Sequence, residues 1–420
     1  MANFHQPATS GAGPSGAAAA LATAASDTGA AVEERLVESA RQLGPLIREH
    51  ADQGERDRRL ARPVIDALLE AGFQRMFTPR SLGGLEVGPV TCARVVEELA
   101  GAHSAAGWAL QTGNTGAWWC ARLSREGAGE LFAAGPNALI AASFQPPHQA
   151  IEVPGGYRFT GRGPLASTIH DAAWVMMTAF ILDDDQPRMV DGHPDVIAVV
   201  LRASDVRIDD TWHSLGMRAT DSNDAVAEDV FVPASRTFHV TPQFEPGPHF
   251  QGPLYRMPAI GSILVVTAPV AMAVARGAIT ELRELAQRKT AMGFARTLKD
   301  RDVVQAALAE AEGTLRSARS FFYETLDAMW QRTLAGEPST LEQKADLLLA
   351  GTHAAKSAST VTELMHRLAG TSGVYARSRL ERHFRDAQTV RHHGFVSQNR
   401  LETVGQVYLG VTPEFPLVAF

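Results

Sequence analysis

Two adjacent histidines near the C-terminus carry the side chains best suited to chemistry in this chain. They follow a charged stretch at 380–386 and stand in the run Arg391-His392-His393-Gly394. Histidine changes its charge near neutral pH, so it can exchange a proton with a substrate in that range. Neighbouring histidines are a poor geometry for one metal ion. The chain also contains no CxxC or HExxH spacing, so the sequence predicts no metal site.

Composition limits the class of protein. The chain has 420 residues, a net charge of -7, and 45% hydrophobic and 20% charged residues. These values are ordinary for a globular protein and give no basic footprint for nucleic acid. The longest apolar stretch, 260–274, is too short to span a bilayer, so we expect no membrane segment. Two cysteines, Cys92 and Cys120, exclude a disulfide scaffold and favour the cytoplasm.

Changes in periodicity divide the chain into four parts. Residues 1–30 are rich in alanine and glycine, which predicts a disordered tail. Residues 31–137 follow a helical period, with Pro63 in a helix first turn and helices expected at about 90–101 and 105–118. Residues 138–247 form a β-domain, a small barrel or sandwich, with strands at 157–160, 174–182, 196–201 and 225–232.

A helical period returns at 248–420. Apolar residues from Val304 to Met329 recur every three or four positions, which predicts one long helix with a buried stripe. Ser339 followed by Glu342 predicts a capping box that begins the next helix. The pattern is that of an α+β protein that is mostly α, with a helical bundle at its end.

This order and five local stretches resemble the acyl-CoA dehydrogenase family. The closer resemblance is to its flavin-dependent monooxygenase branch, the two-component (group D) hydroxylases and N-oxygenases. It covers about residues 35–412 and implies an N-terminal helical domain, a central β-barrel domain and a C-terminal four-helix bundle. The stretches lie at 67–84, 142–146, 157–167, 216–233 and 380–394.

The resemblance implies a flavin site in the β-domain. In relatives, the loop corresponding to 142–146 and the region of Ser167 line the isoalloxazine ring. Phe144 would then wall a flat slot, and Ser143 and Ser167 would supply hydrogen-bond donors. Relatives often carry Trp or Phe two positions before Ser167, where this chain has Leu165. Alternatively, the two serines are ordinary turn or strand residues.

A second group of flavin contacts would come from a neighbouring subunit. Gly370, Thr371 and Ser372 stand where relatives have a glycine-rich turn that meets the neighbour's flavin tail. Arg288 resembles an arginine that reaches the neighbour's flavin phosphate. Alternatively, the glycine-rich turn only ends a helix, and Arg288 is a solvated arginine on a helix face. The resemblance implies a homotetramer, or at least a homodimer.

One position separates two kinds of chemistry within the family. A dehydrogenase needs a carboxylate to remove a proton next to a thioester carbonyl. Its usual position corresponds to Gly394, and the stretch 257–275, where other relatives carry it, has no Asp or Glu. The monooxygenase branch carries a histidine where His393 stands. We therefore expect His393 and Ser167 to be catalytic, with His392 pointing away on the same helix.

The implied reaction is a monooxygenation. Reduced FMN or FAD (FMNH2 or FADH2) would react with O2 through a C4a-hydroperoxyflavin, protected by Ser167 near flavin N5. His393 would exchange a proton with the substrate or the peroxide. The substrate would be an aromatic or polycyclic molecule, or an amine. Residues expected to contact it, with core packing or turn hydrogen bonding as the alternative, are His103, Trp108, Gln111, Asn114 and Arg218.

The chain shows no nicotinamide fingerprint, so a separate flavin reductase would supply the reduced flavin. The one GxGxxG match, at 11–16, lies in the tail with no strand before it. Two other functions remain open. One is an acyl-CoA dehydrogenase that holds FAD and uses an unrecognised base, and the other is a non-catalytic paralogue that binds flavin.

Overall fold

The computed structural model describes residues 29–420, excluding the side chains of 29, 30 and 145–147, and its N-terminal part is helical. Most of the predicted tail and the 11–16 motif therefore lie outside the described residues. Pro63 lies in the first turn of its helix, as the sequence predicts. The helices are α2 (Gly29–Asp57), α3 (Arg62–Glu70), α4 (Pro89–Ala102), α5 (Ser104–Trp108), α6 (Leu110–Trp119) and α7 (Arg125–Leu131).

The helix expected at 105–118 is two helices, α5 and α6, which are separated at Ala109. Helix α6 lies directly against the sheet because Gly116 has no side chain. A Cβ at Gly116 would lie 2.7 Å from the Cβ of Ile140. This close approach places the polar residues of α6 beside the first strand.

The central part is one sheet. Its hydrogen-bonded path runs β10-β7-β3-β1-β2-β9-β8, with β4 paired to β3. Strand β3 is buried on both faces: Met176 belongs to the main core shared with the helices, and Val175 and Met177 belong to the core of the sheet. Burial on both faces explains its continuous apolar sequence. The strands are β1 (Ile140–Val153), β2 (Gly156–Ala166), β3 (Trp174–Asp183), β4 (Gln186–Pro187), β7 (Val196–Arg202), β8 (Arg207–Asp209), β9 (Asn223–Pro233) and β10 (Thr237–His239), beside a two-stranded sheet of β5 (Met189–Val190) and β6 (His193–Pro194).

Two strands are irregular at the same level of the sheet. The pairing of β1 with β3 shifts register between Ser143 and His148, and that of β2 with β9 shifts between Gly163 and Ala166. The 142–146 segment is therefore an irregular part of strand β1, and expecting a loop there was wrong. Such irregularities redirect side chains and are frequent beside functional sites.

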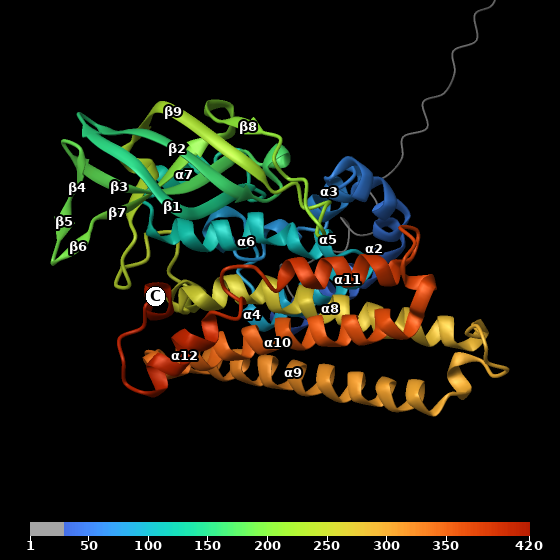
Figure 1. Ribbon diagram of the computed structural model, residues 1–420. Helices are drawn as coiled ribbons and strands as arrows, with labels where there is room; N and C mark the ends of the chain where they lie inside the picture. The colour runs from blue at the N-terminus through green and yellow to red at the C-terminus, as the bar shows by residue number, and fades with distance from the viewer. Residues whose placement is uncertain (1–28) are drawn as a thin grey trace, which may run out of the picture.

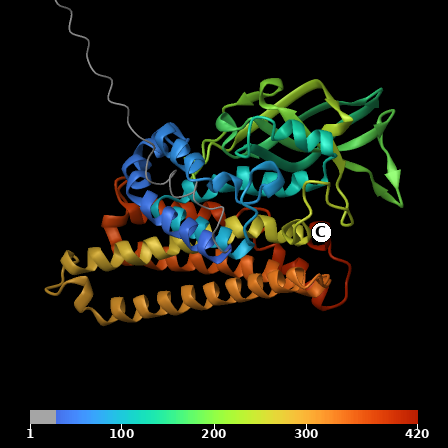
Figure 2. The same ribbon diagram turned by 180° about the vertical axis from the view of Figure 1, so that it is seen from behind.

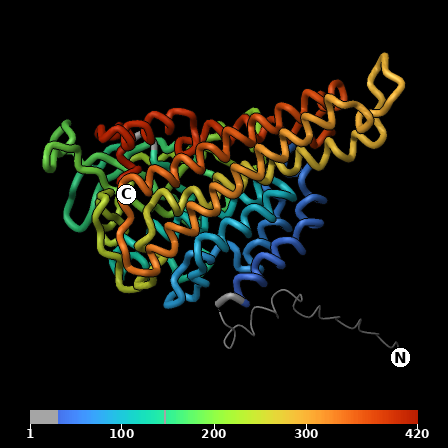
Figure 3. Tube along the Cα trace, turned by 90° about the horizontal axis from the view of Figure 1, so that it is seen from below, coloured from blue at the N-terminus to red at the C-terminus, as the bar shows by residue number. Residues whose placement is uncertain are grey.

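Three long helices and two short ones form the C-terminal part. The expected stripe is present: Val304, Leu315, Phe322 and Met329 are buried along α9. The capping box begins one residue later than expected, at Thr340, whose partner is Gln343. The turn between α8 and α9 projects past the rest of the molecule (Figure 3). These helices are α8 (Ala259–Arg288), α9 (Asp302–Leu334), α10 (Leu341–Ala369), α11 (Arg379–Val390) and α12 (Arg400–Tyr408).

The parts are stacked in layers. The sheet lies over α6, followed by α8 and α11 and then by α9 and α10 (Figure 1). The N-terminal helices cover the other side of the bundle (Figure 2). Helix α8 has the length and composition of a membrane span, but 83% of its most apolar window is buried inside the protein. That burial is typical of the core helix of a bundle.

Candidate active site

A cavity of about 410 Å³ lies where the sheet, α6 and the turn after α11 meet. Its walls are mostly apolar, with a few hydroxyl and amide groups. Six residues that the sequence singled out lie along it: Trp108, Gln111, Ser143, Phe144, Ser167 and His393. A volume of this size is within the range of about 300–1,000 Å³ that is usual for ligand pockets.

His393 lies in the turn that follows α11, half-buried against aromatic side chains. The edge of its ring meets Trp108, with ring centroids 5.2 Å apart, and Phe395 lies 6.0 Å away. Burial lowers the pKa of His393 to about 4, so its imidazole is neutral at physiological pH. Its Nδ1 has no hydrogen-bond partner among the described residues. A buried polar atom without a partner is a position where a ligand can bond.

The position expected for His392 was wrong. Helix α11 ends at Val390, so the two histidines do not share a helix. The His393 amide donates to the Val390 carbonyl at 3.0 Å, which closes a turn at the helix end. The side chain of His392 is exposed, yet it also lines the cavity.

A chain of hydroxyl groups runs along one wall of the cavity. Trp108 Nε1 donates to Ser167 Oγ at 3.0 Å, and Ser167 Oγ shares a hydrogen bond of 2.8 Å with Ser222 Oγ. Ser222 is bonded in turn to Thr220 Oγ1 at 2.7 Å, and Thr220 donates to the Met217 carbonyl at 2.9 Å. Because Thr220 donates its only proton to the Met217 carbonyl, Ser222 donates to Thr220 and Ser167 donates to Ser222. The Ser167 oxygen accepts from Trp108 and keeps one further lone pair that can accept from a ligand.

Two irregular backbone segments bring these side chains together. Ser143 Oγ donates to the Pro164 carbonyl at 2.7 Å and so joins the irregular parts of β1 and β2. Four non-glycine residues near the cavity have a positive φ: Leu165 (62°), Thr168 (56°), Met217 (54°) and Asp221 (52°). Strained backbone of this kind gathers at functional sites.

No Asp or Glu of the described residues lines the cavity. Gly394 lies on the wall where a dehydrogenase would place its base, and α8 contributes Ile263. The nearby carboxylate of Asp386 is buried and already bonded, accepting from Ser104 Oγ at 2.6 Å and from the Met217 amide at 2.7 Å. The cavity therefore has no group in the role of a dehydrogenase carboxylate.

The Arg-Asp corner that precedes the histidines has a positioning role. Arg385 donates to the Leu215 carbonyl at 2.8 Å and to Glu55 at 3.0 Å. A Cβ at Gly216 would lie 2.3 Å from the Arg385 backbone. Burial opposes ionisation of Glu55, but His103 and Arg385 lower its pKa to about 2. The corner thus holds the turn at 212–222, which carries Met217 and Ser222, onto α11.

Three of the expected substrate contacts lie outside the cavity. His103 is buried at the start of α5, where its Nδ1 accepts from the Ala105 amide and its Nε2 lies 3.7 Å from Glu55. Asn114 is fully buried and bonded to the backbone of Phe73, Phe77 and Leu110. Arg218 lies on the opposite side of the 212–222 turn, with its Nε donating to the Ser214 carbonyl.

The residues expected to meet a neighbour's flavin lie together at the far end of the bundle. Lys289 Nζ donates to Ser372 Oγ at 2.8 Å, which places the 370–373 turn beside the end of α8. Arg288 is exposed there and lies 25 residues after Ile263, about 37 Å along the helix. Neither group reaches the cavity of its own chain.

Among the residues that wall the cavity and that the sequence did not indicate are Trp212, Thr220 and Phe395. Trp212 donates from Nε1 to the carbonyls of Met217 and Arg218, both at 3.1 Å, so it closes the turn as well as facing the cavity. The sequence signal that could have indicated Trp212 is its position just before the 216–224 stretch. The direction of its side chain depends on the shape of the turn, which local periodicity does not reveal.

The residues present fit a flavin ring. Phe144, Pro164 and Leu165 provide apolar surface, and Ser143 and Ser167 place polar groups between them. A ring of this kind needs a flat apolar slot with a few polar contacts at its edge. These five residues would hold it, with His393 on the wall formed by the turn after α11.

Family models and similar proteins identify the family of this chain. The acyl-CoA dehydrogenase N-terminal domain matches residues 32–127, and the C-terminal domain matches residues 265–398. Indole-3-acetate monooxygenase of Pseudomonas putida is 32% identical over 87% of this chain and 92% of that protein. The FADH(2)-dependent resorcinol hydroxylase oxygenase component of Rhizobium sp. is 27% identical over 90% of this chain and 95% of that protein.

A solved structure extends the similarity to the whole fold. XiaF from Streptomyces sp., in complex with FADH2 and glycerol, has a TM-score of 0.84 and 24% identity, over 92% of this chain and 98% of that chain. The chain therefore belongs to the acyl-CoA dehydrogenase family and, within it, to the flavin-dependent monooxygenases.

Proposed function

We propose that this protein is the oxygenase component of a two-component flavin-dependent monooxygenase. It takes FMNH2 or FADH2 from a separate reductase and uses O2 to hydroxylate an aromatic or polycyclic substrate or to oxidise an amine. The observation that carries the proposal is a neutral imidazole, His393, which faces Trp108 in a cavity whose described lining has no carboxylate. Reduced flavin, when bound, supplies the electrons that activate oxygen.

The residues of the chain then have distinct roles. His393 is neutral and can accept a proton from a substrate hydroxyl or amine. Ser167, which accepts from Trp108 and donates to Ser222, can use its remaining lone pair to accept from an N–H group of a bound ring. The apolar walls exclude water, which strengthens each polar contact inside the cavity. Gln111 is a polar group of the lining that can orient a substrate.

The relatives support an aromatic substrate. The names indole-3-acetate monooxygenase and resorcinol hydroxylase both describe oxidation of an aromatic molecule. The term oxygenase component in the second name supports a separate reductase. A homotetramer, or at least a homodimer, would allow Arg288 and Gly370–Gly373 of one subunit to meet the flavin tail of another. We place the enzyme in the cytoplasm.

Rapid mixing of the protein and reduced flavin with oxygen tests this function. The wild-type protein should couple flavin oxidation to product with candidate aromatic substrates. His393→Ala and Ser167→Ala should oxidise the flavin while releasing hydrogen peroxide. If flavin oxidises in the wild type as it does free in buffer, the oxygenase proposal fails. Bleaching of oxidised FAD by an acyl-CoA would then favour a dehydrogenase.

A further inference from the structure

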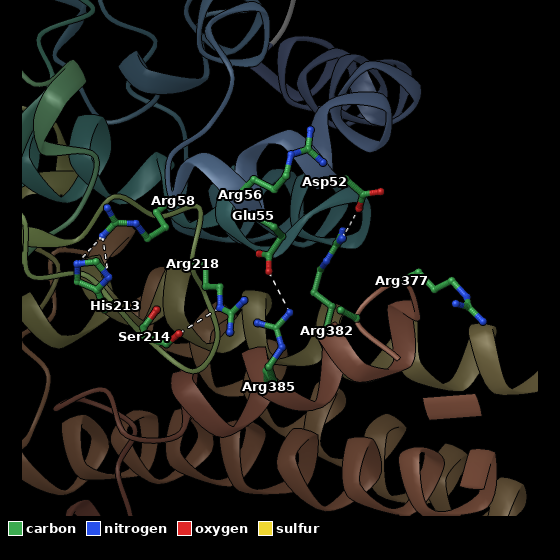
Figure 4. Close-up of a pocket in the computed structure, with 11 residues that line it drawn as sticks. Asp52, Glu55, Arg56, Arg58, His213, Ser214, Arg218, Arg377, Arg382 and Arg385 are labelled. Atoms are coloured by element: carbon green, nitrogen blue, oxygen red, sulfur yellow. Dashed lines mark hydrogen bonds and ion pairs between the residues drawn. The ribbon is translucent and has the colours of Figure 1, made fainter. Parts of the chain in front are cut away.

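A second recess, the arginine cleft, lies on the other side of the 212–222 turn. It has a volume of about 630 Å³ and is formed by the end of α2, the 213–218 part of the turn and the segment at 376–385 that leads into α11. Figure 4 shows its charged side chains coming from these three parts of the chain, with Arg385 reaching Glu55 and Arg382 reaching Asp52, while Arg377 points away at the edge of the cleft. Six of the residues that line it are arginines: Arg56, Arg58, Arg218, Arg377, Arg382 and Arg385.

Positive charge exceeds negative charge in this cleft. Only two carboxylates, Asp52 and Glu55, line it. Asp210 pairs with Arg58, and Glu381 pairs with Arg385, from outside the lining. Even with these two included, six arginines face four carboxylates. The whole chain has a net charge of -7, so the cleft stands out as a local basic site.

Three of the arginines form no ion pair with any carboxylate of residues 29–420: Arg56, Arg218 and Arg377. Arg218 is the most informative because it is half-buried, and its Nε donates only to the Ser214 carbonyl, at 3.2 Å in the same turn. Withdrawing a guanidinium from water without a counter-charge costs free energy. An anion bound in the cleft would supply that counter-charge.

Another half-buried arginine shows the alternative arrangement. The guanidinium carbon of Arg122 lies 3.6 Å from the ring centroid of Phe244 and 4.4 Å from that of Trp119. Aromatic faces stabilise its charge. No such contact is present for Arg218, and the contact of Arg377 is with the exposed Tyr375. Aromatic rings therefore do not stabilise the unpaired arginines of the cleft in the way that they stabilise Arg122.

We propose that the arginine cleft binds a small molecule through a phosphate or diphosphate group. Guanidinium groups bind phosphate oxygens in pairs, and several arginines can converge on one multiply charged group. A single carboxylate would neutralise only one of the three unpaired arginines. The recess is concave and within the volume range of small-molecule sites, which suits a ligand of this size better than a flat protein surface.

The cleft is coupled to the active-site cavity through a shared wall. Trp212 and Met217 line the cavity, while Ser214 and Arg218 line the cleft. The indole of Trp212 donates to the carbonyl of Arg218 itself. An anion that binds Arg218 would therefore change the environment of the Trp212 indole. The fluorescence of Trp212 can then report binding in the cleft.

Calorimetric titration of the flavin-free full-length protein with inorganic pyrophosphate, followed in parallel by tryptophan fluorescence, tests this site. Arg218→Gln should weaken binding at least tenfold. Arg48→Gln is the matched control, since Arg48 is exposed on the same helix as Arg56, about two turns earlier, and does not line the cleft. Absence of saturable binding, or an equal loss in the control, would overturn the proposal.

Competition with flavins then identifies the source of the phosphate. If FMN displaces pyrophosphate and riboflavin does not, the cleft holds the phosphate of the flavin nucleotide. If pyrophosphate and FMN bind together, the cleft takes a separate phosphorylated ligand. If riboflavin displaces pyrophosphate as well as FMN does, the probe occupies the ring cavity and the proposal is wrong. None of these measurements depends on oxygenase activity.

Discussion

The active-site cavity and the arginine cleft share one wall, the 212–222 turn, but contain opposite kinds of residue. The only ionisable side chains that line the cavity, among the described residues, are His392 and His393. The cleft is lined by six arginines, two carboxylates and a histidine. A charge in an apolar cavity is costly without a partner, whereas several charges beside solvent stabilise one another. The turn keeps the two environments apart.

The separation explains how charges act on the cavity without entering it. Asp386 and Arg385 reach the turn through its main chain, at the Met217 amide and the Leu215 carbonyl. The turn can therefore be fixed by ionic groups while its cavity face offers hydroxyls, an indole and a methionine. His393 remains neutral because burial lowers its pKa. Changes at the shared wall, at the histidine and at the hydroxyl chain test this division in turn.

Removing the Asp386 carboxylate should have the largest effect. Asp386→Ala leaves the Ser104 hydroxyl and the Met217 amide buried without an acceptor, and we expect a loss of about 3–5 kcal/mol in the free energy of unfolding. Urea denaturation measures this loss. Both recesses should change, because the turn is their common wall.

Asp386→Asn is the control for that experiment. An amide oxygen can still accept from the Met217 amide, and its NH2 group can donate to Ser104 Oγ once the hydroxyl rotates. We therefore expect most of the stability to return. An Asn variant as unstable as the Ala variant would mean that the negative charge, rather than the hydrogen bonds, holds the turn.

His393 should make stability depend on pH in a defined window. Its folded-state pKa of about 4 is below the value of about 6.5 expected in the unfolded chain, so the unfolded state binds more protons between these values. The contribution of His393 to the free energy of unfolding is fully present above pH 6.5 and is lost as the pH falls toward 4. Since the ring is partly exposed, we expect about 1–2 kcal/mol of the loss at pH 5 to come from this group.

Comparison with His393→Gln isolates the contribution. The difference in unfolding free energy between wild type and variant should shrink by that amount from pH 7.5 to pH 5. Burial and the charge of Arg382 also lower the pKa of His383, which is present in both proteins and cancels. A difference that does not change with pH would show that water reaches the His393 ring.

Much of the fold was predictable from the sequence. The apolar stripe of α9 and the strands β2, β3, β7 and β9 follow a local periodicity, which residue types reveal directly. The break between α5 and α6 was not predicted, and the start of α10 was predicted one residue too early, since helix ends depend on single capping contacts. The loop expected at 142–146 came from the resemblance alone, and that segment is an irregular part of β1 whose register depends on the partner strand β3.

The sequence predicted which residues belong to the candidate site better than it predicted how their side chains are arranged. Ser167, Phe144 and His393 came from a resemblance to a family, and the cavity brings them together. No periodicity indicates that Arg218 would face a different recess from Met217, its neighbour in sequence. That direction is set by a backbone with positive φ at Met217 and by the distant Asp386. Long-range contacts of this kind leave no local signal.

Trp108→Phe tests the smallest of these effects, the orientation of Ser167. The substitution removes the donor to Ser167 Oγ but keeps an aromatic ring beside His393. Loss of one hydrogen bond costs about 1 kcal/mol, which corresponds to about a fivefold rise in hydrogen peroxide released per product formed. Trp118→Phe is the matched control, because Trp118 Nε1 donates to the Leu254 carbonyl away from the cavity. Equal peroxide release in both variants would mean that Trp108 only fills space, whereas a rise in Trp108→Phe alone would place the Ser167 hydroxyl among the groups that guide oxygen transfer.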